Sequence, residues 1–459
     1  SYAYTASATT LTLSVATTGT DTMYAVYIGK AVQTVTPGAN SVGPTALQDN
    51  SVTNAKLADA TQGDVIYYGA AGAPAQLAAG TSGYFLKTQG AGANPVWAAD
   101  TDTVTTLRPN VNPLIINGDM AVAQRSTSVA SITGSGYQTI DRYRTGFSGT
   151  LGTWTQSQST DVPTGKGFAT SLKMDCTTAD ASPAVGDRLS LRYNFEGQDL
   201  QLLKKGTADA EKITLAFWVK SSKTGVHIVN IVDQDNTRNI SKSYTVSIAD
   251  TWEQVVLNFD GDTTGTLDDD NAQSLYVDFY LGAGTNYTSG TLATSWEAVN
   301  NVNVAVGQVN LADSTSNNFL FTAIQLEVGE YTSATLPPFQ HESYGDNLAR
   351  CQRYFQMIAE GNQKIISMAY WASSAEVNFI VHIPFMRTRP SVEYTTGAEY
   401  YAIGGGGSTN TVDNLNMNSW STEMNINLWT TTGAGGTAGY ASQGYSNNAS
   451  AKLGFTAEL

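Results

Sequence analysis

The chain is poor in the residues on which disulfide frameworks, zinc centres and many nucleophilic enzymes depend. Its 459 residues include two cysteines and three histidines. Cys176 and Cys351 are too few and too far apart in sequence to form a disulfide framework. His227, His341 and His382 stand in different zones without an HExxH pair or paired cysteines, which argues against a zinc site. The sequence also lacks a GxSxG elbow and a Walker-type phosphate loop.

Charge is scarce as well, and basic charge above all. Charged residues make up 14% of the chain, against about 25% in an average soluble domain. The 39 acidic residues outnumber 24 lysines and arginines, giving a net charge of −15. Nucleic-acid binding needs a basic patch, so we expect no nucleic-acid partner. The same acidity disfavours an anionic membrane surface, and no apolar run is long enough to span a bilayer.

The residues that take the place of charge are those of strands and turns. Thr, Ser, Asn, Gly and Tyr are abundant, and short β-rich runs such as the one in "ITLAFWVKSSKTG" (213–225) alternate with Gly, Asp and Asn turns. Between about 112 and 340 this pattern predicts an antiparallel β-sandwich. Residues 1–36 also carry strand patterns. The predicted fold class is therefore all-β.

A weak internal repeat follows the first strands. "SVGPTALQDN" (41–50) aligns with "SVTNAKLADA" (51–60), so that Val42, Leu47, Val52 and Leu57 recur every five residues. Such a thin segment cannot bury its own apolar side chains, and identical copies around a symmetry axis would cover them. We expect the same of Phe85. The alternative is a flexible linker, although a solvated linker would lack the nearby aromatic residues.

Three segments of this first part resemble the N-terminal and shaft regions of bacteriophage tail-fibre proteins. They are "GKAVQTVTP" (29–37), "DNSVTNAKLAD" (49–59) and "GTSGYFLKTQGAGANPVW" (80–97). In that family such segments form slender homotrimeric shafts. The resemblance implies a virion-proximal β region at 1–38, which would bind other phage tail or adaptor proteins, and a trimeric shaft at 39–111.

The next part resembles the jelly-roll module of phage tail-fibre and structural proteins, which is similar in plan to carbohydrate-binding β-sandwiches. The resemblance rests on phrases such as "NPLIINGDMAVAQRS" (112–126), "DRYRTG" (141–146) and "VGQVNLADSTSNNFLFTAIQLEVGEYTSATLPPFQ" (306–340). It implies a jelly roll at 112–342. In that family "SYGDNLARCQRYFQ" (343–356) follows the jelly roll, so we predict a small distal β domain, the tip, at 343–459.

The start of the predicted tip domain leaves its secondary structure open. Leu348, Cys351, Tyr354 and Phe355 have a helix-like spacing, which allows either a short helix or a strand that enters the domain. Pro384 then begins a proline-flanked stretch that predicts an edge strand or a corner.

An acidic segment is the one candidate for a metal. "DGDTTGTLDDDN" (260–271) contains Asp260, Asp262, Asp268 and Asp270, which could bind a structural calcium because calcium takes oxygen ligands from acidic loops. The segment lacks the spacing and the terminal Glu of an EF-hand. The competing interpretation is a solvated acidic turn, and we expect no other cofactor.

Carboxylates are also the one abundant class of reactive side chain. Glycosidases place two of them across a sugar ring. Here they cluster in sequence within a few residues of Gly, Asn or Thr, in the turn contexts where Asp normally occurs: Asp233, Asp235, Glu253, Asp260, Asp262 and Asp268–Asp270. We therefore predict that the chain is not an enzyme.

Aromatic residues remain as candidates for ligand recognition, because Trp and Tyr offer rigid apolar platforms with polar edges. Trp218 and Trp252 lie in strand patterns and are predicted to belong to the core. Others lie in polar or Gly-rich contexts and are predicted to bind glycan: Trp420, Tyr401 and Tyr440 in the tip, and Trp154, Tyr287 and Trp296 in the jelly roll.

Together these features predict an elongated all-β homotrimeric fibre with an N-terminal β region, thin shaft, jelly roll and small C-terminal β domain. Its predicted function is to attach a phage virion, after assembly in the host cytoplasm, to a polysaccharide of the bacterial surface. One alternative is a tailspike-type polysaccharide depolymerase, although the sequence lacks the ladder of a parallel β-helix. The other is a purely structural fibre or decoration protein.

Overall fold

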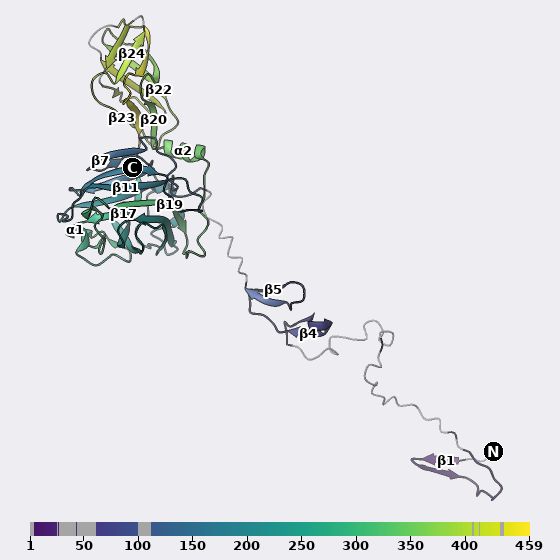
Figure 1. Cartoon of the computed structure of the whole chain (residues 1–459). Helices are drawn as coiled ribbons and strands as arrows, with labels where there is room; N and C mark the ends of the chain where they lie inside the picture. Colours follow the sequence, from purple (N-terminus) through teal and green to yellow (C-terminus); the bar gives the residue numbers. More distant parts are fainter. Residues whose placement is uncertain are drawn as a thin grey trace. The chain divides into compact units, whose positions relative to one another are not determined.

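The structure is a computed structural model that describes residues 4–24, 26, 43, 61–99, 112–405, 408–412, 414–431 and 436–459. The chain divides into two compact units, Ser1–Thr101 and Asp102–Leu459. Nearly all regular structure is β-strand (Figure 1), which confirms the predicted all-β class. All strand pairs in the described residues are antiparallel.

The first unit is built from hairpins of two strands each. The pairs are β1 (Tyr4–Ser7) with β2 (Thr10–Leu13), β3 (Val65–Tyr68) with β4 (Pro74–Leu77), and β5 (Tyr84–Lys87) with β6 (Val96–Ala99). Trp97 links the last two hairpins, because its indole Nε1 donates to the Ala78 carbonyl (2.6 Å) and its ring lies against Gly80. Of the residues predicted to line a shaft, Phe85 is exposed, whereas Val42, Leu47, Val52 and Leu57 lie outside the described residues.

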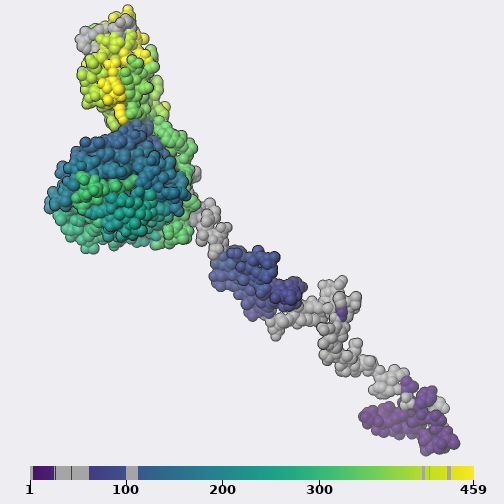
Figure 2. Space-filling model, in the orientation of Figure 1, coloured from purple at the N-terminus to yellow at the C-terminus, as the bar shows by residue number. Residues whose placement is uncertain are grey.

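The strands between Ser128 and Val328 form a two-layer sandwich. The six-stranded sheet has the order β16 (Glu253–Phe259), β13 (Ile213–Ser221), β19 (Asn318–Val328), β11 (Ser171–Thr178), β10 (Thr153–Ser159), β7 (Ser128–Ile132). The seven-stranded sheet has the order β18 (Glu297–Ala298), β15 (Arg238–Val246), β14 (Gly225–Asp233), β17 (Gln273–Ala283), β12 (Arg188–Glu196), β9 (Tyr143–Ser148), β8 (Gly136–Tyr137). In Figure 2 this part, coloured blue to green, has a closed and rounded surface.

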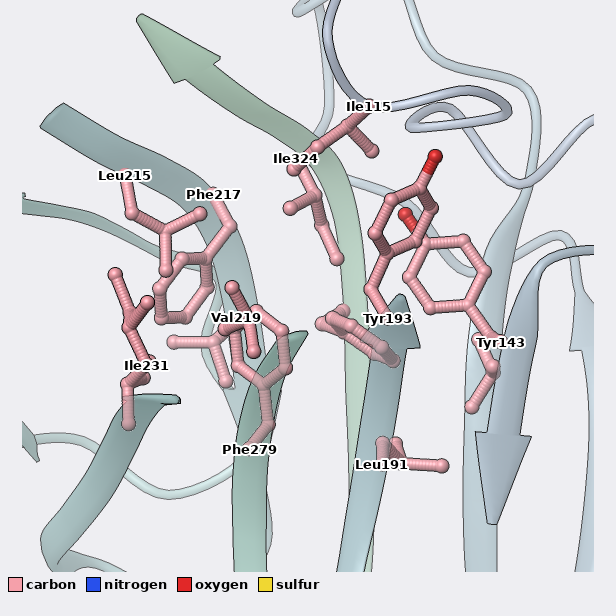
Figure 3. Packing of buried hydrophobic residues seen from close by; sticks show 14 of the residues in the cluster. Ile115, Tyr143, Leu191, Tyr193, Leu215, Phe217, Val219, Ile231, Phe279 and Ile324 are labelled. Atoms are coloured by element: carbon pink, nitrogen blue, oxygen red, sulfur yellow. The ribbon is translucent and has the colours of Figure 1, made fainter. Parts of the chain in front are cut away.

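The core of the sandwich lies between these two sheets. Leu215 and Phe217 of the six-stranded sheet meet Phe279 and Tyr193 of the other (Figure 3). The Phe217 and Phe279 rings pack edge to face with centroids 5.2 Å apart. Every second residue of β13 contributes to this layer, as the period of two in a strand requires. The intervening residues of β13 therefore face the outside of the sandwich.

The remaining elements outside the sheets of the sandwich are short. Helix α1 (Thr285–Thr288) follows β17, and single 3-10 turns occupy η4 (Gly197–Asp199), η5 (Gln201–Leu203), η6 (Asn301–Asn303) and η7 (Leu311–Asp313). In the first unit, η3 (Ala70–Gly72) joins β3 to β4. Cys176 and Cys351 are both free and buried.

Residues 343–459 form a second, smaller β domain. Its seven-stranded sheet has the order β25 (Ser408–Val412), β24 (Tyr401–Gly405), β28 (Ala441–Ser446), β21 (Ile365–Trp371), β22 (Glu376–His382), β27 (Asn425–Thr431), β26 (Asn416–Met417). A three-stranded sheet has the order β20 (Phe355–Glu360), β29 (Lys452–Thr456), β23 (Ser391–Tyr394). The stretch between β22 and β23, which contains Pro384, is a corner without strand structure.

The start of this domain contains both of the elements that the sequence left open. Helix α2 (Tyr344–Gln352) begins after Ser343, whose Oγ accepts from the Asp346 backbone N–H (3.2 Å), and β20 follows directly. Glu196 of the sandwich accepts hydrogen bonds from Arg353 (2.6 and 2.8 Å) and from the Tyr354 hydroxyl. The two β domains thus belong to one compact unit, and the boundaries at 38/39, 111/112 and 342/343 stay predictions.

Candidate functional site

Two of the six predicted glycan-binding aromatics are well exposed, but they do not form one surface. Trp420 is 81% exposed and Tyr440 is 62% exposed. The Tyr440 carbonyl accepts from the Trp371 backbone N–H, next to the start of β22. Trp420 lies in the loop 418–424, which leads into β27. The start of β27 pairs with the other end of β22, at His382. At about 3.3 Å per residue, the strand separates the two sites by about 20 Å.

Two others are buried, so the prediction that they contact a ligand is wrong. Tyr401 is 1% exposed, and its hydroxyl donates to the Lys452 carbonyl (2.5 Å). Trp154 is fully buried in the sandwich core, and its indole donates to the Leu151 carbonyl (2.7 Å). Both belong to strands whose partner layers cover them, although the residues that flank them in sequence are polar or small.

Tyr287 and Trp296 are half-buried and packed against their own neighbours. The indole of Trp296 donates to the Asp260 carbonyl (2.7 Å). The Tyr287 hydroxyl donates to Ser148 (3.3 Å), and the Arg188 guanidinium lies 5.2 Å from its ring centre. Neither ring lies in a described cavity, and their role in binding stays a prediction.

The four aspartates of the calcium hypothesis do not converge. Asp262 is buried and paired with Lys205 (3.0 Å) and Arg238 (2.8 Å). Asp260 is exposed near Lys212, and Asp268 and Asp270 are exposed as well. Among the described residues no group of three or more His, Cys, Asp or Glu side chains could hold a metal ion.

A lysine takes the place that the hypothesis gave to calcium. The Lys205 ammonium contacts Asp233 as well as Asp262, and it donates to the carbonyls of Thr264 (3.0 Å) and Gly265 (2.9 Å). Burial raises the pKa of the Asp262 carboxyl, but hydrogen bonds from Arg238 and Lys205 hold it below its usual value. The Lys205 ammonium thus supplies positive charge and hydrogen bonds to the oxygens of Asp233, Asp262, Thr264 and Gly265, as a metal ion would.

Trp218 and Trp252 are not in the core, contrary to the prediction. Both are half-buried on the outside of the six-stranded sheet. The Trp252 indole donates to Asp161 (2.9 Å). Because Phe217 faces the core, its neighbour Trp218 has to face outward, and an apolar run in the sequence conceals this alternation.

Trp218 forms part of a cavity of about 340 Å³. The floor is made by three neighbouring strands, with Ala216 and Trp218 from β13, Gln254 from β16, and Ala323 and Gln325 from β19. No prediction from the sequence included this pocket, because its floor comes from strands that are separated by up to 100 residues. The one signal in the sequence that could have indicated the pocket is the alternation along β13, which places Trp218 at an outward-facing position.

A β-bulge shapes this floor. Ala216 pairs with Gln325 and Trp218 pairs with Thr322, so β19 has one residue more than β13 at this point. Ala323, within the bulge, has a positive φ of 56°. A non-glycine residue in this left-handed region costs on the order of 1–3 kcal/mol, and such residues cluster at functional sites.

Two loops form the walls of the pocket. From the loop 160–170, the Lys166 Nζ lies 5.3 Å from the centre of the Trp218 ring. Phe168 packs edge to face on Phe339 (5.1 Å between centroids) and lies 5.2 Å from the His341 ring. Phe339 and His341 belong to the segment 333–341, which follows β19 and completes the wall. The pocket therefore combines an indole floor with an aromatic wall.

One polar group at the floor has an unused hydrogen-bonding atom. Gln325 is 6% exposed, and its Nε2 donates to the Pro337 carbonyl (3.2 Å). Its Oε1 has no hydrogen-bond partner within the described part of the chain. A buried polar atom without a partner is costly, and this oxygen is itself closed off from solvent, so that a bound molecule would reach it only after the Gln325 side chain turns.

Two further cavities lie at the contact of the two β domains. One, of about 390 Å³, is lined by Arg350 and Arg353, but Glu342 and Glu196 already pair with these arginines. The other, of about 190 Å³, is lined by Arg125, which pairs with Glu393. Their charged groups are used within the protein, so the Trp218 pocket is the stronger candidate.

The chain has distant structural neighbours but no match by sequence. It matches no protein-family model, and no curated protein matches it. It is similar to the enzymatically active domain of tailspike protein 4 of bacteriophage CBA120, with 14% identity and a TM-score of 0.25 over 47% of this chain and 21% of that one. The chain thus spans about a fifth of the length of that tailspike domain.

Carbohydrate-binding modules are also among the neighbours. The family 11 module of the cellulosomal cellulase Lic26A-Cel5E of Clostridium thermocellum has 14% identity and a TM-score of 0.22 over 44% of this chain and 99% of that one. A CBM4 structure has 12% identity and a TM-score of 0.21 over 44% of this chain and 94% of that one. Likenesses this distant assign no ligand to the chain.

The prediction that the chain is not an enzyme is wrong by this comparison, because an enzymatically active tailspike domain is among its structural neighbours. The TM-score of 0.25 transfers no activity from that domain. No helix in the described part of the chain is both long and apolar enough to cross a membrane.

Proposed function

We propose that the chain binds carbohydrate through the Trp218 pocket. The observation that carries this proposal is an open pocket that combines an indole floor with an aromatic wall. The C–H face of a sugar packs on an aromatic ring. The volume of about 340 Å³ is within the range of small-molecule sites.

The wider role that we propose is host attachment by a phage tail fibre. Support comes from the resemblance of 29–37, 49–59, 80–97 and 112–126 to that family. In this proposal the fibre belongs to the virion, its N-terminal region binds other tail or adaptor proteins, and its ligand is a polysaccharide of the host surface.

Self-association is the second element of the proposal. Ile66 and Tyr68 on β3, and Tyr84, Phe85 and Leu86 on β5, are exposed on hairpins of only two strands. An isolated hairpin of this kind is marginally stable. Copies of the same chain, three in the resembling family, would cover these side chains, and three copies would also raise the avidity of weak sugar sites.

The exposed Trp420 supports a second contact surface on the C-terminal domain. At 81% exposure this ring contributes little to packing, although its own loop is held by a hydrogen bond from Arg389 to the Asn418 carbonyl (3.0 Å). Large exposed aromatic residues are common at recognition surfaces. We place Trp420 second because no described cavity includes it.

A glycan array probed with the whole chain tests the proposal, followed by the variants Trp218→Ala and Trp252→Ala. Trp252 is the matched control, because it is a half-buried tryptophan of the same sheet region outside the pocket. We expect Trp218→Ala to lose binding at least tenfold and Trp252→Ala to retain it. Melting curves of both variants identify any loss of folding.

Equal binding by the wild type and Trp218→Ala would contradict the pocket as the site. Loss of binding in Trp420→Ala instead would move the site to the C-terminal domain. The same mixtures, assayed for new reducing ends, show whether the chain cleaves the glycan that it binds.

A further inference from the structure

We propose that the sugar in the Trp218 pocket is acidic and carries a carboxylate that pairs with Lys166. This inference rests on the proposed carbohydrate binding and adds the chemical class of the ligand. It follows from the charges around the pocket and the position of Lys166.

The charge of the pocket is opposite to that of the chain. The whole chain has 39 acidic residues and a net charge of −15. The lining of the pocket nevertheless contains Lys166 and His341 and not one Asp or Glu. An anionic ligand would therefore meet no like charge within the pocket.

Lys166 is available for a ligand. Two other lysines of the same sheet region are paired, Lys173 with Asp175 (2.9 Å) and Lys220 with Asp161 (2.7 Å). The Lys166 ammonium has no ion pair and no hydrogen bond among the described residues, and its contact is the face of Trp218.

The local backbone holds Lys166 over the pocket. It stands between Gly165 and Gly167, which both have positive φ values (73° and 87°). The Lys166 backbone N–H donates to the Pro163 carbonyl (3.3 Å), and an added Cβ on Gly167 would come within 3.6 Å of the His341 ring. This turn is therefore packed against the aromatic wall.

The geometry fits a uronic acid. Lys166 Nζ lies over the Trp218 ring, 5.3 Å from its centre, and the side chain is exposed, so a sugar that packs on this ring displaces the ammonium from the ring face to the edge of the sugar. A carboxylate at that edge could form a charge-assisted hydrogen bond of about 2.7–2.9 Å.

The experiment measures binding of the full chain to oligosaccharides of glucuronate, galacturonate and mannuronate, each beside its carboxyl-reduced form. We expect at least one uronate to bind about two- to fivefold more tightly than its reduced form, as one exposed ion pair allows. Added salt should weaken that preference.

Single substitutions of Lys166 test whether its charge, and not the shape of the pocket, causes the preference for the uronate. Lys166→Gln should lose the preference for the uronate, and Lys166→Arg should retain it. Lys242→Gln, which removes the same charge from the other sheet, should behave as the wild type. Melting curves check that each variant is folded.

The outcomes distinguish this inference from the proposed function. If uronates and their reduced forms bind equally, and Trp218→Ala abolishes both, the acidic-sugar inference is wrong and carbohydrate binding stands. Tighter binding of sulfated sugars than of uronates would also contradict the proposal that the ligand carries a carboxylate. If no saccharide of the panel or of the glycan array binds, both proposals fall.

Discussion

The buried lysine of the jelly roll should be essential for stability. Lys205 is 7% exposed, and Asp233 and Asp262 next to it are 0% and 5% exposed. Lys205→Met keeps the length of the side chain but leaves Asp233 with hydrogen bonds from Asn236 alone. Breaking a buried ion pair by removal of one partner costs about 3–5 kcal/mol.

Denaturant unfolding and melting curves measure this loss. For a domain of this size, each kcal/mol lowers the melting temperature by about 2–4 °C, so we expect a decrease of about 6–20 °C. Lys212→Met is the matched control, because Lys212 is about half exposed and pairs with exposed Glu330. We expect little measurable change in that variant.

A second substitution tests the reason for the loss. Asp233→Asn in the Lys205→Met background removes the carboxylate that was left without its cation. The double variant should therefore be more stable than Lys205→Met, by about 1 kcal/mol or more, and the two effects should not add. A loss below about 1 kcal/mol for Lys205→Met, or simple additivity, would refute the reasoning.

Three further predictions concern pH, packing and assembly. Burial lowers the pKa of His227 to about 4. The neutral, buried imidazole therefore contributes up to about 3 kcal/mol to the free energy of unfolding above about pH 6.5, and this contribution is lost as the pH falls toward 4. His227→Phe should therefore lose less stability than the wild type between pH 7 and pH 4.5 in denaturant unfolding, and an equal loss would contradict this. Trp154→Ala should destabilise the sandwich by about 3–5 kcal/mol, whereas Trp420→Ala should leave the melting curve unchanged; similar melting curves for the two variants would contradict their assigned burial. Sedimentation of the whole chain should give three copies, and Phe85→Ser should weaken the assembly, since burial of such a side chain contributes about 1.5–3 kcal/mol in each copy; a stable monomer of the wild-type chain would contradict self-association.

The sequence predicted where strands lie much better than which way their side chains face. The β-rich run at 213–225 contains β13, which begins at the first residue of the run and ends at Ser221. Trp218 and Trp154 were nevertheless assigned to the wrong environments, because neighbouring residues suggested a core position for the first and a loop for the second. Burial depends on the opposing sheet, which comes from distant parts of the chain.

The candidate site could not be predicted for a related reason. Its lining comes from the segments 166–168, 216–218, 254, 323–325 and 333–341, which only the sheet order brings together. In the same way, Lys205 meets Asp233 and Asp262 at sequence separations of 28 and 57 residues, so that the acidic segment gave no indication of an internal cation.

The alternation of β13 has a consequence for how this protein can change over generations. Leu215, Phe217 and Val219 hold the sandwich together, whereas Ala216 and Trp218 line the pocket. Mutations at the half-buried Trp218 can therefore alter what is bound without disturbing the core. A library randomised only at Trp218 and at the exposed residues 164–167 should remain largely folded, so that new binding specificities can arise on one unchanged core.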